Sequence, residues 1–170
     1  RSSGELASFR IDAETGALTL LSVVAGGEDP AYLLPDSAGR FLIAAYYASN
    51  CVTVHRLNAD GVIEDEALHH IPTAEKAHGL AFNSEETSLY VTHTGANRIY
   101  HFHFDAETGE LTAADPPFAE TPSEDHPRHV ALHPSGHWAY VSNEAGDSIG
   151  VFAIDETTQS LERIQTEPTI

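Results

Sequence analysis

The segment HFHFDAETGELTA, residues 101–113, decides the fold because the chain contains it four times in related form. Each copy is a strand of alternating apolar and polar residues, then a turn rich in Asp, Gly or Thr, then a second apolar start. The other copies are SFRIDAETGALTL (residues 8–20), VHRLNADGVIEDE (54–66) and VFAIDETTQSLER (151–163). The equivalent turn positions are Asp12, Asn58, Asp105 and Asp155. Their spacing defines a repeat of about 48 residues.

A second shared unit precedes the last three copies and completes the repeat. It occupies residues 31–54, 78–102 and 128–152, and each version holds further strand patterns joined by turn residues. Those turn residues are Gly39 and Gly136 at one position and Asn50, Asn97 and Asp147 at the next. Four short strand patterns at this period are typical of a propeller blade. We therefore predict an all-β protein, a β-propeller of four-stranded antiparallel blades.

The repeat also predicts how the chain is divided. We expect the outer half of a blade in residues 1–26 and whole blades in residues 27–74, 75–123 and 124–170. A propeller must close into a ring, because an unclosed stack leaves apolar blade faces and strand edges uncovered. About 3.5 blades is half of a seven-bladed ring. We expect either part of a longer chain or a homodimer that completes the ring.

Composition excludes several classes of partner. The chain has 26 acidic residues against 8 basic ones and a net charge of −18, which disfavours nucleic acid as a partner. It has no apolar run long enough to cross a membrane, and no signal-peptide pattern. Its one cysteine, Cys51, excludes an internal disulfide and is expected to be structural. We predict a cytoplasmic protein with no nucleic-acid or membrane partner.

Positions that break the repeat are the best candidates for function. At the start of the innermost strand, two blades have alanine where the last blade has Arg128. At the end of the second strand, Glu144 stands where the other blades have Tyr47 and Thr94. These two strand ends lie at the same mouth of the central channel in a propeller. We expect Arg128, His129 and Glu144 to meet there, with His78 arriving from the blade before.

Their chemistry suits acid–base work on an anion. Arginine binds a carboxylate or phosphate with two parallel hydrogen bonds, and histidine and glutamate transfer protons near neutral pH. His93 lies beside the proposed mouth and is a candidate substrate-binding residue. A structural alternative stays open: Arg128 and Glu144 could form a salt bridge between strands, and the histidines could bond to nearby loops.

Other sites are disfavoured by spacing or by missing motifs. His129, His133 and His137 are four residues apart, but they lie across a strand, a turn and another strand, so they share no face for zinc. The chain has no G-x-S-x-G elbow and no glycine-rich nucleotide motif. We expect no metal and no cofactor.

For several bulky or polar side chains, the alternation of apolar and polar residues along a strand predicts whether they face a core or solvent. Phe41, Leu89 and Trp138 are expected in the blade cores, because each lies at an apolar position of a strand pattern. His101 and His103 share one face of a strand and are expected to face solvent.

The segment PRHVALHPSGHWAYVSNE, residues 127–144, closely resembles a motif of the seven-bladed lactonase family. That family includes propeller-type 6-phosphogluconolactonases and the fungal 3-carboxy-cis,cis-muconate lactonizing enzyme. Residues 77–102 are similar to the blade before it, and the D-x-E-T-G-x-L turns are also common in the family. Two departures are Lys76-Ala77, where the family has His-Pro, and His126, where it has glycine.

The resemblance covers essentially the whole chain and implies a function. It implies that His78, Arg128 and Glu144 are catalytic, and that a second arginine comes from a later blade beyond Ile170. We expect metal-independent hydrolysis of an anionic sugar lactone at the channel mouth, with Arg128 and His129 binding substrate and Glu144 or His78 as general base. The alternatives are cyclisation of a muconate-type substrate and a non-catalytic propeller that binds a ligand or protein.

Overall fold

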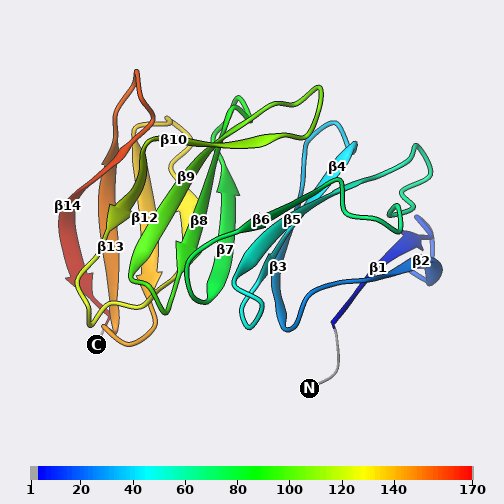
Figure 1. Cartoon of the computed structure of the whole chain (residues 1–170), viewed down its shortest axis with the longest axis horizontal. Helices are drawn as coiled ribbons and strands as arrows, with labels where there is room; N and C mark the ends of the chain where they lie inside the picture. Colours follow the sequence, from blue (N-terminus) through cyan, green and yellow to red (C-terminus); the bar gives the residue numbers. More distant parts are fainter. Residues whose placement is uncertain (1–3, 170) are drawn as a thin grey trace.

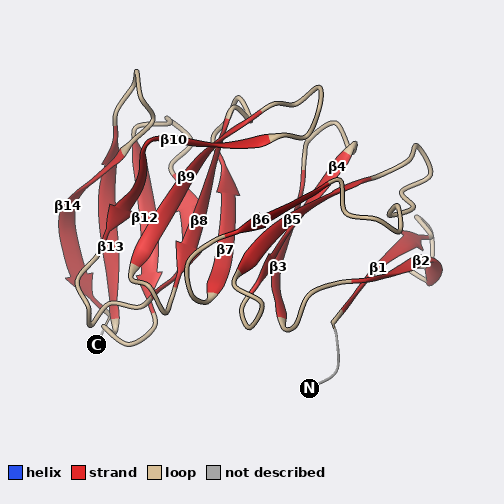
Figure 2. Cartoon of the chain, in the orientation of Figure 1, coloured by secondary structure: helices blue, strands red, loops and turns tan. Residues whose placement is uncertain are grey.

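A computed structural model describes residues 4–169, and every regular element in this part is a β-strand (Figures 1 and 2). The strands of the first half are β1 (Glu5–Ile11), β2 (Leu18–Ala25), β3 (Pro30–Pro35), β4 (Phe41–Tyr46), β5 (Cys51–Arg56), β6 (His69–Pro72) and β7 (Ala77–Phe82). Those of the second half are β8 (Ser88–His93), β9 (Arg98–Phe104), β10 (Leu111–Glu120), β11 (Pro127–Leu132), β12 (Trp138–Asn143), β13 (Ser148–Ile154) and β14 (Leu161–Pro168). Residues 1–3 of the predicted half-blade and residue 170 of the last predicted blade lie outside this range.

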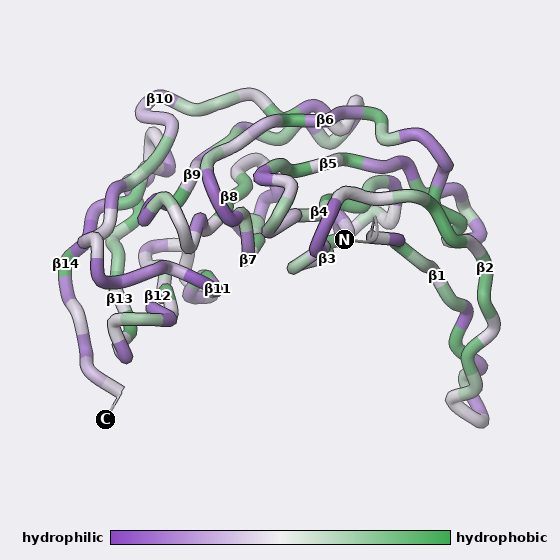
Figure 3. The backbone as a smooth tube through the Cα atoms, turned by 60° about the horizontal axis from the view of Figure 1, so that its bottom comes forward, coloured by the Kyte–Doolittle hydropathy of each residue, from purple (hydrophilic) through white to green (hydrophobic). Residues whose placement is uncertain are grey.

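The strands form one two-stranded sheet and three four-stranded sheets. β1 pairs with β2, and the larger sheets are β3-β4-β5-β6, β7-β8-β9-β10 and β11-β12-β13-β14, all antiparallel and in chain order. The first strands of the larger sheets adjoin one another, since β7 contacts both β3 and β11. The sheets follow an open arc with β1–β2 at one end and β14 at the other (Figure 3). This is a β-propeller of about 3.5 blades, as the repeat predicts.

Turn chemistry explains why the strands end where they do. Asp105 begins the turn between β9 and β10, where its Oδ1 accepts hydrogen bonds from the backbone N–H groups of Glu107 and Thr108. These bonds also hold the pKa of Asp105 below its ordinary value. The β11–β12 hairpin turns at Gly136, which has φ +76°, a left-handed conformation that glycine adopts without strain.

The hydrophobic cores lie between consecutive sheets. In β4, Phe41, Ile43 and Ala45 pack toward the β7–β10 sheet, while the alternate residues pack toward β1 and β2. All six residues of β4 are buried because this sheet is covered on both faces. The core predictions for Phe41 and Leu89 are confirmed, since both are at most 1% exposed.

Trp138 was expected in a core, and that prediction is wrong. Its side chain is 39% exposed and that of Tyr140 is 38% exposed, although Ala139 and Val141 between them are fully buried. The face of β12 that carries Trp138 and Tyr140 has no sheet against it in residues 4–169. Apolar side chains are also exposed at the other end of the arc, on β1 and β2, where Ile11 and Leu18 are the most exposed. Both ends of the stack therefore present uncovered apolar faces, as expected for an open ring.

His101 was expected to face solvent, and this is also wrong. Its ring is 3% exposed and stacks on Tyr90 at a centroid distance of 5.1 Å, while its Nε2 bonds to the Ser88 hydroxyl at 3.0 Å. Burial lowers its pKa to about 4, so the ring is neutral at pH 7. Its strand neighbour His103 is exposed, as predicted.

The structure contains no membrane-spanning helix within its described residues.

Candidate active site

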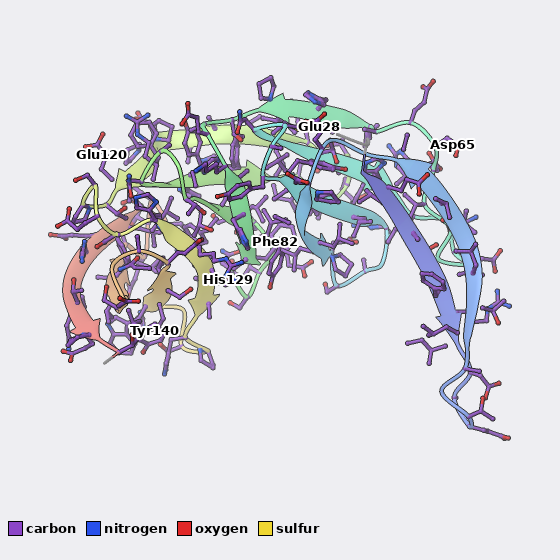
Figure 4. The ribbon with its side chains drawn as sticks, turned by 90° about the horizontal axis from the view of Figure 1, so that it is seen from below. Glu28, Asp65, Phe82, Glu120, His129 and Tyr140 are labelled. Carbon is purple, nitrogen blue, oxygen red and sulfur yellow. The ribbon has the colours of Figure 1, made fainter. Side chains whose placement is uncertain are left out.

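The backbone that carries Arg128 and Glu144 is held by hydrogen bonds from the residue just before β11, and the carbonyl bond recurs in all three whole blades. Residue His126, just before β11, has φ +55°, and its N–H donates to Asn97 Oδ1 at 2.9 Å. Its carbonyl accepts the N–H of Glu144 at 3.0 Å. This links the start of β11 to the end of β12, so Arg128 and Glu144 emerge side by side. His129 lies on the concave side of the arc, while Glu120 lies on the convex side (Figure 4).

Arg128 stands at the centre of the cluster. Its Nε–H donates a hydrogen bond to His78 Nε2 at 3.1 Å, and the same Nε lies 3.5 Å from Glu144 Oε2. The side chains of Arg128 and Glu144 are each about half exposed, at 48% and 47%. Within residues 4–169, the two terminal amino groups of the Arg128 fork have no hydrogen-bond partner. The fork is therefore positioned by its Nε and keeps four N–H donors for a ligand.

His78 is buried and neutral. Burial lowers its pKa to about 4, and the positive charges of His129, when protonated, and Arg128 act in the same direction. Because Nε2 accepts the Arg128 hydrogen bond, the proton of the neutral ring is on Nδ1, which is buried without a partner among the described residues. The lone pair that a general base needs is thus already occupied.

His129 lies against His78. Their ring centroids are 4.8 Å apart in an edge-to-face arrangement, and the centroid of the Tyr32 ring lies 6.1 Å from that of His129. Partial burial and the charge of Arg128 lower the pKa of His129. His129 is an exposed residue, so its nitrogens are accessible to a bound molecule. The arrangement gives one cation, one carboxylate and two neutral imidazoles at pH 7.

Close contact between β7 and β11 fixes the position of the Arg128 backbone. Thr92 Oγ1 donates to the Arg128 carbonyl at 2.6 Å and accepts the N–H of Gly79 at 2.8 Å. A Cβ on Gly79 would lie only 2.6 Å from the Arg128 oxygen. A residue without a side chain is therefore required at position 79 for the two innermost strands to approach this closely.

A cavity of about 260 Å³ opens beside the cluster. It is lined by His78, Arg128 and Glu144 together with Tyr47, Asp29, Pro30 and Ala31. Tyr47 and Asp29 were not identified as candidates from the sequence. The repeat contained a signal for Tyr47, because it occupies the same position in its blade as Glu144 does in the last one.

His93 is not brought to this cluster. Its ring is fully buried, with Nδ1 3.1 Å from the Val91 carbonyl oxygen and its centroid 4.5 Å from that of Tyr100. A side chain without exposed surface has no route to a bound substrate, so His93 supports the blade from inside. No group of three or more potential ligands within residues 4–169 is arranged to hold a metal ion.

The fold and this cluster define a class: a β-propeller in which neighbouring blades bring an arginine, a histidine and a carboxylate together. The model of the family described as "Lactonase, 7-bladed beta-propeller" matches residues 1–170. The chain belongs to this family of seven-bladed propeller lactonases.

Several relatives support the assignment. The chain is 33% identical over 159 residues to a 6-phosphogluconolactonase of Pectobacterium carotovorum, a match that covers 94% of this chain and 47% of the relative. Against a 6-phosphogluconolactonase of Klebsiella pneumoniae, identity is 30% with the same coverage. The solved structure of a periplasmic gluconolactonase of Pseudomonas aeruginosa has a TM-score of 0.87 and 27% identity, and the match covers 99% of this chain and 50% of that one. The chain spans about half the length of these relatives.

Proposed function

We propose that this chain forms the catalytic half of a lactonase that hydrolyses an anionic sugar lactone of the 6-phosphogluconolactone type. The observation that carries the proposal is the Arg128 fork, held at its Nε by neutral His78 and flanked by the Glu144 carboxylate in one cavity. The family and the names of the relatives agree with this reaction type.

In the proposed reaction, the lactone carbonyl oxygen points at the terminal amino groups of Arg128. These donors stabilise the negative charge that develops on this oxygen as water attacks the carbonyl carbon. Glu144 takes the proton from the attacking water. The ring C–O bond then breaks, the carbonyl reforms, and the ring oxygen leaves as a hydroxyl after receiving that proton from Glu144.

Glu144 is a better candidate for the base than His78. Its carboxylate is about half exposed and has no hydrogen bond from any described side chain, so it can accept a proton from water. The Nε2 lone pair of His78 is engaged by Arg128, which makes His78 a positioning residue for the fork. His129, exposed beside it, is placed to orient substrate hydroxyl groups. Each of these steps uses side chains alone, so the proposal requires no metal.

The uncovered faces at the two ends of the arc are part of the proposal. Ile11 and Leu18 at one end and Trp138 and Tyr140 at the other are exposed apolar residues on sheet faces. We propose that further blades cover them, from a second copy of this half-ring or from more of the same polypeptide. The mass in solution, measured by light scattering, separates a closed dimer from a single half-ring.

The proposal is tested with Glu144→Gln, which keeps the shape of the side chain and removes its basicity. Hydrolysis of 6-phosphoglucono-δ-lactone releases acid that a pH-stat measures at pH 7. We expect kcat to fall about 10²- to 10⁴-fold, the usual contribution of a general base. Glu110→Gln, an exposed change of equal charge in the turn between β9 and β10 of the preceding blade, serves as the control.

Two results would contradict the proposal. A Glu144→Gln protein with unchanged kcat would mean that Glu144 and Arg128 form only a salt bridge between strands. A wild-type protein that binds 6-phosphogluconate in calorimetry but never hydrolyses the lactone would be a binding module.

A further inference from the structure

Lys76 is the single lysine of the chain, and its backbone is fixed. It precedes β7 at the position that Asp29 and His126 occupy before β3 and β11, and all three have positive φ. The Lys76 N–H donates to Asn50 Oδ1 at 2.8 Å, and its carbonyl accepts the N–H of Thr94 at 3.0 Å. Both backbone groups are therefore held, and the residue lines a cavity together with Asp29 and Tyr47.

The ammonium group of Lys76 has no carboxylate within 4.0 Å among residues 4–169, whereas Arg40, Arg98 and Arg163 each form an ion pair. Its Nζ lies 5.5 Å from the centroid of the Tyr47 ring, a distance suited to a cation–π contact. This contact holds the cation in place without neutralising it. Arg10 and Arg56 are also exposed and form no ion pair among the described residues, so what distinguishes Lys76 is its place in a cavity next to the Arg128 cluster.

Tyr47 connects Lys76 to the proposed catalytic cluster. The same ring lies edge-to-face with His78 at a centroid distance of 6.1 Å. Tyr47 and Asp29 line both the cavity beside Arg128 and a neighbouring cavity of about 440 Å³. That second cavity is lined by Lys76, with Ala48, Asn50 and Glu75. The two cavities adjoin at shared side chains, with one cation at each end.

The lining suits a polyhydroxylated molecule with an anionic group at its far end. Carboxylates at Asp29 and Glu75 disfavour an anion beside them, but they accept hydrogen bonds from sugar hydroxyl groups. Lys76 is the one cationic group of this cavity, and a phosphate ester is a preferred partner of an uncompensated ammonium.

We propose, on the basis of the function above, that Lys76 binds the anionic group of the substrate remote from the lactone and so selects phosphorylated over neutral sugar lactones. Arg128 acts at the reacting carbonyl, Lys76 acts at the other end of the molecule, and Tyr47 keeps the two subsites in a fixed relation. Lys76 is thereby a specificity-determining residue that takes no part in the bond changes.

The test compares two substrates that differ only in the remote group: 6-phosphoglucono-δ-lactone and glucono-δ-lactone. Lys76→Gln is expected to lower kcat/KM for the phosphorylated lactone about 10- to 100-fold, the effect of losing one charge-assisted hydrogen bond. For the neutral lactone, kcat/KM stays within about threefold, since Lys76 has no partner there. The control is Arg56→Gln, which removes one exposed cation at the end of β5, where its guanidinium lies 5.4 Å from the centroid of the Phe41 ring. It should change neither value.

Equal losses for both lactones, or no loss for either, would overturn the inference while leaving the lactonase proposal intact. If the wild-type protein hydrolyses neither lactone, the proposed function fails by itself. Calorimetric titration with 6-phosphogluconate and gluconate then decides the inference. Weaker binding of the phosphorylated acid alone by the Lys76→Gln protein supports it, and unchanged or equally weakened binding refutes it.

Discussion

Gly79→Ala tests whether the contact between β7 and β11 controls the reactivity of the cluster. The new Cβ would lie 2.6 Å from the Arg128 carbonyl oxygen, 2.9 Å from His129 Cα and 3.0 Å from Thr92 Oγ1. Ordinary contacts begin at 3.4 Å, so the strands must separate by about 1 Å. Two of the three atoms are backbone and cannot rotate away. The separation would also stretch the 2.6 Å hydrogen bond from Thr92 to the Arg128 carbonyl.

The expected magnitude follows from that displacement. Overpacking of this kind costs about 1–3 kcal/mol of unfolding free energy, which urea denaturation measures. A shift of about 1 Å at a positioned catalytic group lowers the rate about 100-fold. We therefore expect kcat for the phosphorylated lactone to fall by that factor in protein that is still folded, as monitored by circular dichroism.

Gly150→Ala is the matched control, because its Cβ would meet only side-chain atoms, the nearest being a ring atom of Phe152 at 3.0 Å, and no backbone atom of a neighbouring strand. It should leave kcat unchanged. The reasoning is refuted if Gly79→Ala loses stability as expected but keeps kcat within threefold of wild type, since Arg128 could then move without consequence.

Two further predictions concern stability. The pKa of His93 is lowered to about 4 by burial, so its neutral ring favours folding above pH 6.5, and this contribution is lost as pH falls from 6.5 to 4. His93→Gln should remove up to about 3 kcal/mol of that pH dependence, which urea unfolding at pH 7.5 and 4.5 measures, and an unchanged slope would exclude His93 as its source. Arg163→Gln leaves the buried Asp125 carboxylate without its 2.7 Å partner and should cost about 2–3 kcal/mol in thermal or urea unfolding. Glu120→Gln, which breaks an exposed pair, should cost under about 1 kcal/mol, and equal costs would contradict this difference.

The sequence predicts those residues of the candidate site that differ from their counterparts in the other repeats. Arg128 and Glu144 differ from their counterparts in the other blades, and the antiparallel pairing of β11 with β12 brings the two strand ends together. Tyr47 and Lys76 vary at equivalent positions too. Their proposed role depends on the Tyr47 ring, which contacts both Lys76 and His78, and on cavities that adjoin between two blades. No single repeat contains these contacts.

The sequence by itself determined the blades: period-two alternation, Asp- and Gly-containing turns and a repeat near 48 residues are local properties. Only the tertiary structure decided how deeply each side chain is buried. His101 and Trp138 lie in similar alternating strands, yet the first is buried and the second exposed. The reason is that a sheet face is buried only when another sheet packs on it. The same packing buries His78, which lowers its pKa and keeps it neutral, and brings Arg128 from the next blade within hydrogen-bond distance of it.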